Sequence, residues 1–220
     1  MSRSATDALL AGNRGFAHRG LHGCGLPENS LAAFRAAIDA DVGIECDLRL
    51  SRDGFAMVVH DADLTRMCDL NVTPESLDAS ALMRLRLGAG RETIPWLGDL
   101  LKLVDGKVPL LLELKYARGT NEPLCRAVAA TVKNYRGVFG VMSFEPFIGA
   151  WFAARLPDIA RGIVLDGSDA EWERTAKMKR SAAQFVAVEV ACIAQPWVAQ
   201  LRRAGIGILC WTIATADQRA

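Results

Sequence analysis

The chain has 220 residues, of which 51% are hydrophobic and 23% are charged. This composition provides enough apolar material for a substantial core and excludes disorder, collagen and coiled coil. The 26 Lys and Arg residues against 25 Asp and Glu residues give a formal net charge of +1. No global field therefore favours nucleic acid or an anionic membrane surface, and a charged substrate must be recognised by local clustering.

The cysteines and the N-terminal residues indicate the cellular compartment in which the protein is expected. The six cysteines are scattered, with no CxxC pair and no zinc-like spacing, which favours reduced thiols over a disulfide framework. Residues 1–15 contain no apolar run of the signal-peptide kind, and no uncharged stretch reaches the roughly 18 residues of a membrane span. We therefore expect a cytoplasmic protein without stable membrane insertion.

Short β-rich runs alternate with helical patterns along the chain. The predicted strands are 15–18, 43–50, 55–60, 108–114, 138–142, 162–165, 185–190 and 206–212, and the predicted helices are 30–40, 80–85, 97–104, 122–135, 146–155 and 196–204. Such alternation implies parallel strands joined by right-handed crossovers. An eight-fold (β/α) barrel and an open doubly wound sheet both fit, but the missing glycine-rich dinucleotide fingerprint after the first strand disfavours the open sheet.

One connection breaks this alternation. Only four residues, 51–54, separate the second predicted strand from the third, and they end in Asp53-Gly54. A parallel crossover needs a dozen or more residues, whereas Asp-Gly between two β-rich runs is a hairpin signal. The third strand should therefore run antiparallel to the second and bring His60 back to the level of Glu45 and Asp47.

Ionisable residues occupy strand positions where apolar residues are expected. Strand alternation places Glu45, Asp47 and Arg49 on one face of the second strand, and Glu113 and Lys115 on one face at the end of the fourth. Each carboxylate alone could be a solvated loop residue or half of an ion pair, but two on one face repel each other. A hard divalent cation, Mg²⁺ or Ca²⁺, would offset the excess charge, while zinc usually has a tighter set of His or Cys ligands.

The sequence contains three histidines, His18, His22 and His60. A lone histidine at a strand end is more often a satisfied polar residue than a catalyst. His18 and His60, however, each end a strand beside the carboxylate strand, and two imidazoles can activate a nucleophile and protonate a leaving group at a phosphodiester. His22 lies in a glycine-rich loop and is interpreted as a solvated loop residue.

These residues belong to a longer ordered set of motifs. They are Ala17-His18-Arg19-Gly20, Pro27-Glu28-Asn29-Ser30, Glu45-Cys46-Asp47, Val58-Val59-His60-Asp61, Glu113-Leu114-Lys115, Met142-Ser143-Phe144 and Trp211-Thr212. From Phe16 to Thr212 the chain resembles the glycerophosphodiester phosphodiesterase family. That family is a (β/α)-barrel phosphodiesterase that splits glycerophosphodiesters into glycerol 3-phosphate and an alcohol.

The resemblance implies a role for each of nine residues. The divalent metal would be held by Glu45, Asp47 and Glu113, and the acid–base pair would be His18 and His60. Phosphate oxygens would be contacted by Arg19 and Lys115, and the glycerol pocket would be lined by Phe144 and Trp211, unless these are plain core or rim aromatics. Gly20 is expected to allow close backbone approach to the ligand, and Asn29 or Ser30 to cap the helix that follows.

We expect residues 1–220 to form a single domain, a TIM-type (β/α) barrel with a β-hairpin insertion after the second strand. Without the antiparallel hairpin strand, seven parallel strands can be counted. In the resembled family an eighth follows Trp-Thr and one helix, which would place it beyond Ala220. The sequence therefore suggests a C-terminally truncated barrel in which strands 15–18 and 206–212 flank a gap.

The expected function is metal-dependent hydrolysis of a small glycerophosphodiester, with Mg²⁺ or Ca²⁺ as cofactor and no nucleic-acid partner. One rival is a phospholipase D-like enzyme acting on lysophospholipid or sphingolipid, which would need exposed apolar loops or an anchor, and none stands out in the sequence. Others are a non-catalytic phosphate-binding relic of the fold and an interaction domain. The preferred alcohol, the metal, the division of roles between the histidines and the oligomeric state stay open.

Overall fold

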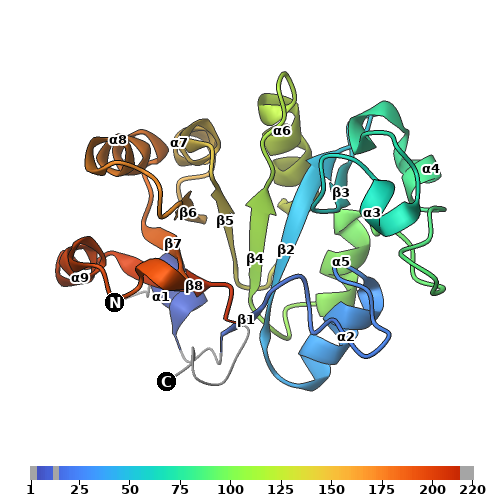
Figure 1. The fold of residues 1–220 in the computed structure, drawn as a ribbon, viewed down its shortest axis with the longest axis horizontal. Helices are drawn as coiled ribbons and strands as arrows, with labels where there is room; N and C mark the ends of the chain where they lie inside the picture. The colour runs from blue at the N-terminus through green and yellow to red at the C-terminus, as the bar shows by residue number, and fades with distance from the viewer. Residues whose placement is uncertain (1–3, 12–14, 214–220) are drawn as a thin grey trace. The chain divides into compact units, whose positions relative to one another are not determined.

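The computed structural model describes residues 4–11 and 15–213, which belong to two compact units. The first unit is Gly12–Phe139, and the second combines Met1–Ala11 with Gly140–Ala220. Within each unit, parallel strands alternate along the chain with helices (Figure 1). Each unit is described below by itself.

The first unit is organised around strand β2, which is parallel to β1 on one side and to β4 on the other. Helix α2 packs on β2 and on α5, and α5 packs on α6. Its elements in chain order are β1 (Phe16–Ala17), α2 (Leu31–Asp39), β2 (Gly43–Leu50), β3 (Ala56–Val58), α3 (Thr65–Cys68), the 3-10 turn η1 (Pro74–Ser76), α4 (Ala79–Leu82), α5 (Leu97–Val104), β4 (Leu110–Leu114) and α6 (Asn121–Val132).

Apolar spacing explains why the helices of this unit lie where they do. Helix α5 buries Leu97, Leu100, Leu101 and Val104, the i, i+3, i+4, i+7 pattern of a helix with one apolar face. Helix α2 begins after Ser30, whose Oγ accepts a hydrogen bond from the backbone N–H of Ala33 at 3.1 Å. Such a cap satisfies one of the free N–H groups at a helix start.

The hairpin expected after β2 is confirmed. Strand β3 pairs antiparallel with β2 in a register that places Val58 opposite Leu48, and the turn uses Gly54 at φ +87°. The backbone N–H of Val59 donates to the carbonyl of Asp47 at 3.0 Å. Continuing this register brings His60 to the level of the residue between Glu45 and Asp47, as the residue count predicts.

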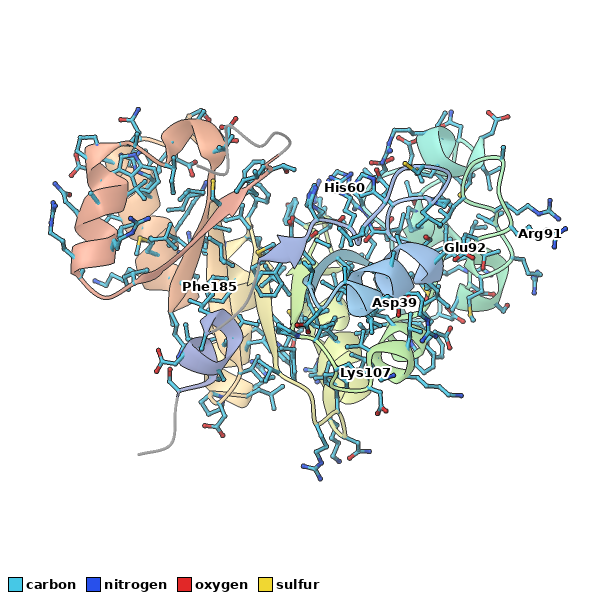
Figure 2. The ribbon with its side chains drawn as sticks, turned by 90° about the horizontal axis from the view of Figure 1, so that it is seen from below. Asp39, His60, Arg91, Glu92, Lys107 and Phe185 are labelled. Carbon is cyan, nitrogen blue, oxygen red and sulfur yellow. The ribbon has the colours of Figure 1, made fainter. Side chains whose placement is uncertain are left out.

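The chain segment from β3 to the start of α5 forms a small hydrophobic core of its own, the satellite core. Its buried members are Met57, Val59, Leu64, Ala79, Leu82, Leu87 and Ile94. Glu92, labelled in Figure 2, accepts a hydrogen bond from the backbone N–H of Ala32 at 3.0 Å. This hydrogen bond connects the segment that carries the satellite core, residues 57–94, to the first turn of α2.

The second unit contains four strands in parallel, each paired with the next along the chain. Its elements are α1 (Ala5–Leu10), β5 (Phe139–Ser143), α7 (Pro146–Arg155), β6 (Ala160–Leu165), α8 (Glu171–Ser181), β7 (Phe185–Glu189), the 3-10 turn η2 (Val190–Cys192), α9 (Pro196–Arg203) and β8 (Gly207–Trp211). Close packing inside this sheet requires Gly162, because a Cβ there would lie 2.1 Å from the Phe185 ring.

Three helices were not expected from the sequence, namely α1, α3 and α8. Helix α8 is rich in charged residues and buries only Ser181 of its 11 residues, so it lacks the apolar stripe that helix prediction depends on. Its start is fixed instead by Glu173, whose carboxylate accepts from the backbone N–H of Ala170 at 2.8 Å. The eighth parallel strand expected beyond Ala220 stays a prediction.

Candidate active site

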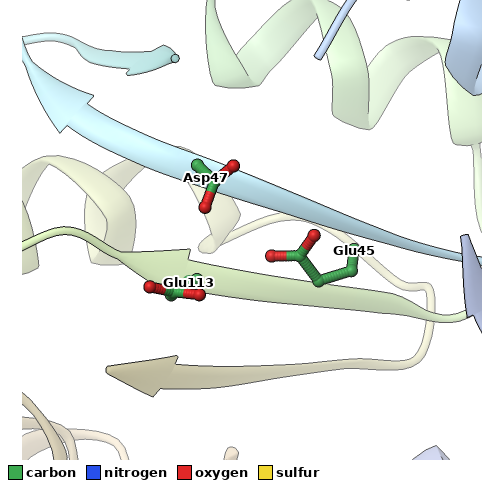
Figure 3. Close-up of side chains that lie close together, drawn as sticks. All are labelled: Glu45, Asp47 and Glu113. Atoms are coloured by element: carbon green, nitrogen blue, oxygen red, sulfur yellow. The ribbon is translucent and has the colours of Figure 1, made fainter. Parts of the chain in front are cut away.

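Three buried carboxylates form the centre of the first unit's polar site. Glu45 and Asp47 lie on β2, and Glu113 lies on β4 directly opposite Asp47 in the parallel register. One oxygen of each lies within 4.8 Å of the others, and the three residues are only 4%, 0% and 6% exposed (Figure 3). The convergence predicted from strand alternation is therefore present in the structure.

Two cations contact this cluster. The Lys115 ammonium lies 2.9 Å from Asp47 Oδ1 and also donates to Glu113. Arg19 follows β1, donates its backbone N–H to Glu45 Oε2 at 3.0 Å, and places its Nε 3.2 Å from Asp47 Oδ2. Three carboxylates against two cations leave a formal excess of one negative charge at the centre.

The electrostatics differ among the three acids. Burial, reinforced by the charge of Asp47, raises the pKa of Glu45 well above its ordinary value. Burial also raises the pKa of Glu113, although Lys115 opposes this. For Asp47 burial acts in the same direction, but the pKa is lowered because Lys115 and His60 outweigh it.

The donor set fits a hard cation. Oε1 of Glu45 is buried and has no hydrogen-bond partner among the described residues, and a buried carboxylate oxygen without a partner is costly. Three carboxylates with no cysteine or histidine among them match the oxygen ligands that Mg²⁺ and Ca²⁺ take. The cluster of Glu45, Asp47 and Glu113 could therefore hold a divalent metal ion.

The two strand-end histidines lie beside this centre. Burial, with a contribution from the charge of Arg19, lowers the pKa of His18 to about 4. Burial also lowers the pKa of His60, partly offset by Asp47 and Asp61. Nδ1 of His60 lies 2.8 Å from Oδ1 of Asp61. Both shifts favour the neutral form of the imidazole at pH 7. His22 is exposed, as expected.

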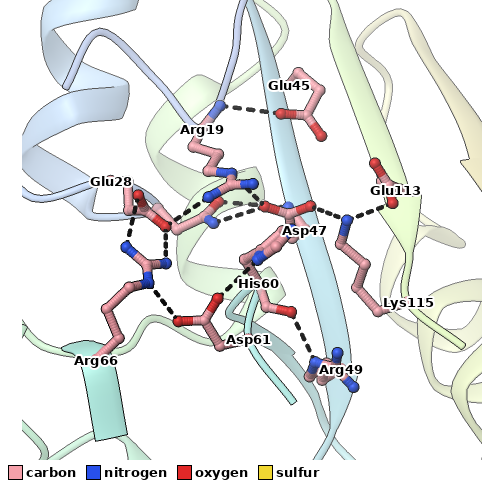
Figure 4. A network of polar contacts seen from close by, with 11 residues as sticks. Arg19, Glu28, Glu45, Asp47, Arg49, His60, Asp61, Arg66, Glu113 and Lys115 are labelled. Atoms are coloured by element: carbon pink, nitrogen blue, oxygen red, sulfur yellow. Dashed lines mark hydrogen bonds and ion pairs between the residues drawn. The ribbon is translucent and has the colours of Figure 1, made fainter. Parts of the chain in front are cut away.

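A second layer of charged residues was not predicted from the sequence (Figure 4). Arg66 bonds to Asp61 and to both oxygens of Glu28, and Glu28 also pairs with Arg19 at 2.9 Å. The Pro-Glu-Asn-Ser motif was interpreted only as a loop and helix start, which left Glu28 without a role. Its position in a motif that precedes the carboxylate strand was the only available signal.

Asn29 and Gly20 of these loops make contacts that the sequence did not suggest. Ser30 caps α2, whereas Asn29 is buried, adopts φ +54° and donates from Nδ2 to Asp47 Oδ2 at 2.9 Å. Asn29 is therefore a partner of the carboxylate cluster. Gly20 lies against α2, where a Cβ would be 2.9 Å from atoms of Ala33, and its expected approach to a ligand stays a prediction.

The two aromatic residues named from the sequence belong to the second unit. Phe144 follows β5 and Trp211 ends β8, and their rings meet edge to face with centroids 5.9 Å apart. Phe144 is 36% exposed. The indole N–H of Trp211 is buried without a hydrogen-bond partner among the described residues. The pair is thus partly accessible, with one polar group unsatisfied.

The parallel α/β architecture and the acidic cluster define the class: an α/β protein of the TIM type with a buried acidic cluster on β2 and β4 that could hold a metal ion. Residues 18–220 match the model of the glycerophosphoryl diester phosphodiesterase family. The chain belongs to this family. The sequence-based interpretation of both family and fold class is therefore confirmed.

Individual proteins with similar sequences carry names from the same family. The "Probable glycerophosphodiester phosphodiesterase 2" of Mycobacterium tuberculosis is 41% identical over 136 residues, covering 60% of this chain and 49% of that protein. The chain thus spans about half the length of this relative. The "Putative glycerophosphodiester phosphodiesterase YhdW" of Bacillus subtilis is 27% identical over 212 residues, covering 90% and 84% of the two chains.

Among solved structures, an Oleispira antarctica phosphodiesterase in complex with the product sn-glycerol-3-phosphate superposes with a TM-score of 0.88 and 26% identity, covering 98% of this chain and 90% of that one. Within residues 4–11 and 15–213, no helix is long and apolar enough to cross a bilayer.

Proposed function

We propose that this chain hydrolyses glycerophosphodiesters to glycerol 3-phosphate and an alcohol. The observation that carries the proposal is the buried cluster of three carboxylates in contact with Arg19 and Lys115, in a member of the glycerophosphoryl diester phosphodiesterase family. The sn-glycerol-3-phosphate bound to the Oleispira antarctica relative supports this substrate class.

Charge balance supports a phosphodiester as ligand. The three carboxylates and one phosphodiester carry four negative charges. Arg19, Lys115 and one divalent cation carry four positive charges. The loaded site is then formally neutral, whereas without a cation the buried carboxylates and the substrate would repel each other.

The proposed cation is Mg²⁺ or Ca²⁺, held by Glu45, Asp47 and Glu113. When bound, such an ion neutralises phosphate charge and polarises the phosphorus centre. Arg19 and Lys115 contact the phosphate oxygens and orient the diester. Both reach the site from strand ends and are held there by the same carboxylates, so the phosphate is met by cations whose positions are already fixed.

The acid–base work falls to His18 and His60. One removes the proton from the nucleophile, which is water or the neighbouring glycerol hydroxyl, and the other protonates the departing alcohol. In the second unit we propose that Phe144 and Trp211 line the glycerol pocket, which the partial exposure of Phe144 permits. We place the enzyme in the cytoplasm, where its six free cysteines would stay reduced.

The direct test measures release of glycerol 3-phosphate from glycerophosphocholine and glycerophosphoethanolamine. We expect activity that is lost with chelator and restored by Mg²⁺ or Ca²⁺. Glu113→Gln should abolish turnover, whereas Glu122→Gln, which alters an exposed ion pair on α6, should leave it unchanged. No release from either substrate would refute the function, and full activity after exhaustive chelation would refute the metal requirement.

One observation favours a second candidate, a lysophospholipid-cleaving enzyme. The sequence suggested no exposed apolar loop, but the second unit exposes large apolar side chains after each of its four parallel strands: Phe144, Phe147, Trp172, Ile193 and Ile213. Exposed apolar side chains of this kind suit a substrate whose glycerol carries an acyl chain. Lysophosphatidylcholine offered beside glycerophosphocholine decides between them, because a higher kcat/KM for the lysolipid would favour this candidate.

A further inference from the structure

His60 is held at two points. Its imidazole Nδ1 lies 2.8 Å from Oδ1 of Asp61, and its backbone carbonyl accepts a hydrogen bond from Arg49 Nε at 2.9 Å. Arg49 lies on β2 on the same face as Glu45 and Asp47. Both the main chain and the ring of His60 are therefore tied to fixed neighbours.

Asp61 is itself fixed from the other side. Arg66, on the short helix α3, donates from Nε to Asp61 Oδ2 at 2.7 Å. The same guanidinium donates to both oxygens of Glu28, at 2.6 and 3.2 Å. A planar guanidinium that makes three such bonds leaves the Asp61 carboxylate little freedom to rotate.

Glu28 extends this chain to the other histidine's loop. Its Oε1 also accepts from Arg19 at 2.9 Å, and Arg19 directly follows His18 in the sequence. The carboxylates of Glu28 and Asp61 are only 14% and 21% exposed, whereas the Arg66 side chain that links them is 51% exposed. The chain of contacts therefore joins the two histidine-bearing loops (Figure 4).

We propose that Asp61, locked by Arg66 and Glu28, is a positioning residue that keeps His60 in the Nδ1–H tautomer and leaves Nε2 as its proton-exchanging atom. An ionised carboxylate can only accept hydrogen bonds, so the ring nitrogen that faces it must carry the hydrogen. This inference rests on the proposed function, in which His60 is one of the acid–base pair.

Asp61→Asn separates positioning from simple packing, because the two side chains have the same shape. Arg66 can only donate, so it draws the amide oxygen of the new side chain toward itself and turns the NH₂ group toward His60. Nδ1 of His60 must then accept, and the proton moves to Nε2. A histidine held in the wrong tautomer loses on the order of 10²–10⁴ in rate.

The double variant Asp61→Asn with Arg66→Met makes the opposite prediction. Without the guanidinium, the amide can turn its oxygen toward His60 and accept from Nδ1–H again. We expect the double variant to recover the original tautomer. Its kcat should be at least tenfold higher than that of Asp61→Asn alone. A merely structural role of these residues predicts the reverse, since a second lost contact should do further damage.

The experiment uses the full chain at pH 7.5. Long-range ¹H–¹⁵N NMR of the imidazoles reports the His60 tautomer, and steady-state kinetics with glycerophosphocholine separate kcat from KM. The matched control is Asp78→Asn, because Asp78 forms a comparable two-bond pair with Arg52 in the same unit. This control should change neither the tautomer nor kcat.

We expect Asp61→Asn to show an Nε2–H tautomer and a kcat lowered about 10²-fold or more, with KM changed less than about threefold. An unchanged Nδ1–H signal, or a double variant less active than the single one, would overturn the positioning role. A wild-type chain that releases no glycerol 3-phosphate would overturn the proposed function instead, and the NMR signal would then decide the tautomer claim alone.

Discussion

The contribution of the Asn29–Asp47 contact to the free energy of unfolding can be measured by comparing two substitutions at position 29. The buried amide donates to Asp47 Oδ2 at 2.9 Å from a backbone at φ +54°. Asn29→Gly tolerates positive φ but removes the amide, and with it both the bond to the Asp47 carboxylate and a longer bond from the Asp47 backbone N–H to Asn29 Oδ1 at 3.4 Å. The charged bond dominates, so we expect a loss of about 1.5–3 kcal/mol of the free energy of unfolding. Asn29→Ala should cost about 1 kcal/mol more, because a Cβ disfavours the left-handed conformation.

Urea unfolding in chelator, followed by circular dichroism, measures both values. Asn71 is exposed, so Asn71→Ala is the control and should change the unfolding free energy by less than about 0.5 kcal/mol. Calorimetry should also show about 10–100-fold weaker Mg²⁺ or Ca²⁺ binding by both Asn29 variants, since Asp47 loses a partner that orients it. Equal unfolding free energies for wild type and Asn29→Gly would refute the reasoning.

Three further predictions address the histidines, the pH dependence and the core. His18→Ala and His60→Ala should each lower kcat about 10²–10⁴-fold with unchanged circular dichroism, and near-normal turnover would remove that residue from the mechanism. Burial and Arg19 lower the pKa of His18 to about 4, so between pH 6.5 and 4 the unfolded chain binds a proton that the folded chain does not, and stability falls as the pH falls. In metal-free protein His18→Asn should recover about 1–2 kcal/mol of that loss in urea titrations, after allowance for solvent screening; parallel pH profiles would contradict this. Gly162→Ala should destabilise the chain by about 1–3 kcal/mol in thermal unfolding, because its Cβ would lie 2.1 Å from the Phe185 ring, and an unchanged midpoint would show that the ring can move aside.

The carboxylate cluster was predictable because it depends on two regularities of strands. Side chains alternate faces, which puts Glu45 and Asp47 together, and parallel neighbours carry the ends of their strands to the same edge, which adds Glu113. The hairpin was predictable for a similar reason, since four residues are too few for a crossover. In these cases the chemistry lies on regular elements, and local periodicity is enough to place it.

The second layer was not predictable in the same way. Glu28, Asp61 and Arg66 lie on loops and on a helix of four residues, where no periodicity relates sequence position to direction. Their contacts depend on the tertiary fold, because Glu28 and Arg66 are 38 positions apart in the sequence and still form a hydrogen bond. The sequence offered Asn29 or Ser30 as the cap of α2, because a residue just before a helix is often its cap. Here Ser30 supplies the cap, and Asn29 is free to contact Asp47.

The antiparallel return of β3 explains why one short stretch of chain can supply both carboxylates of β2 and a histidine beside them. Asp47 and His60 are 13 positions apart (60 minus 47), a distance of about 43 Å in extended chain at roughly 3.3 Å per residue. The pairing of β3 with β2 brings the two residues back together in space. Residues 48–50 of β2 run away from Asp47, and residues 56–58 of β3 pair with them while running in the opposite direction. An ordinary crossover would instead carry the chain to the opposite edge of the sheet before the next strand begins. The same return also places Asp61 where Arg66 can reach it, so the hairpin both delivers His60 to the carboxylates and brings the group that orients it.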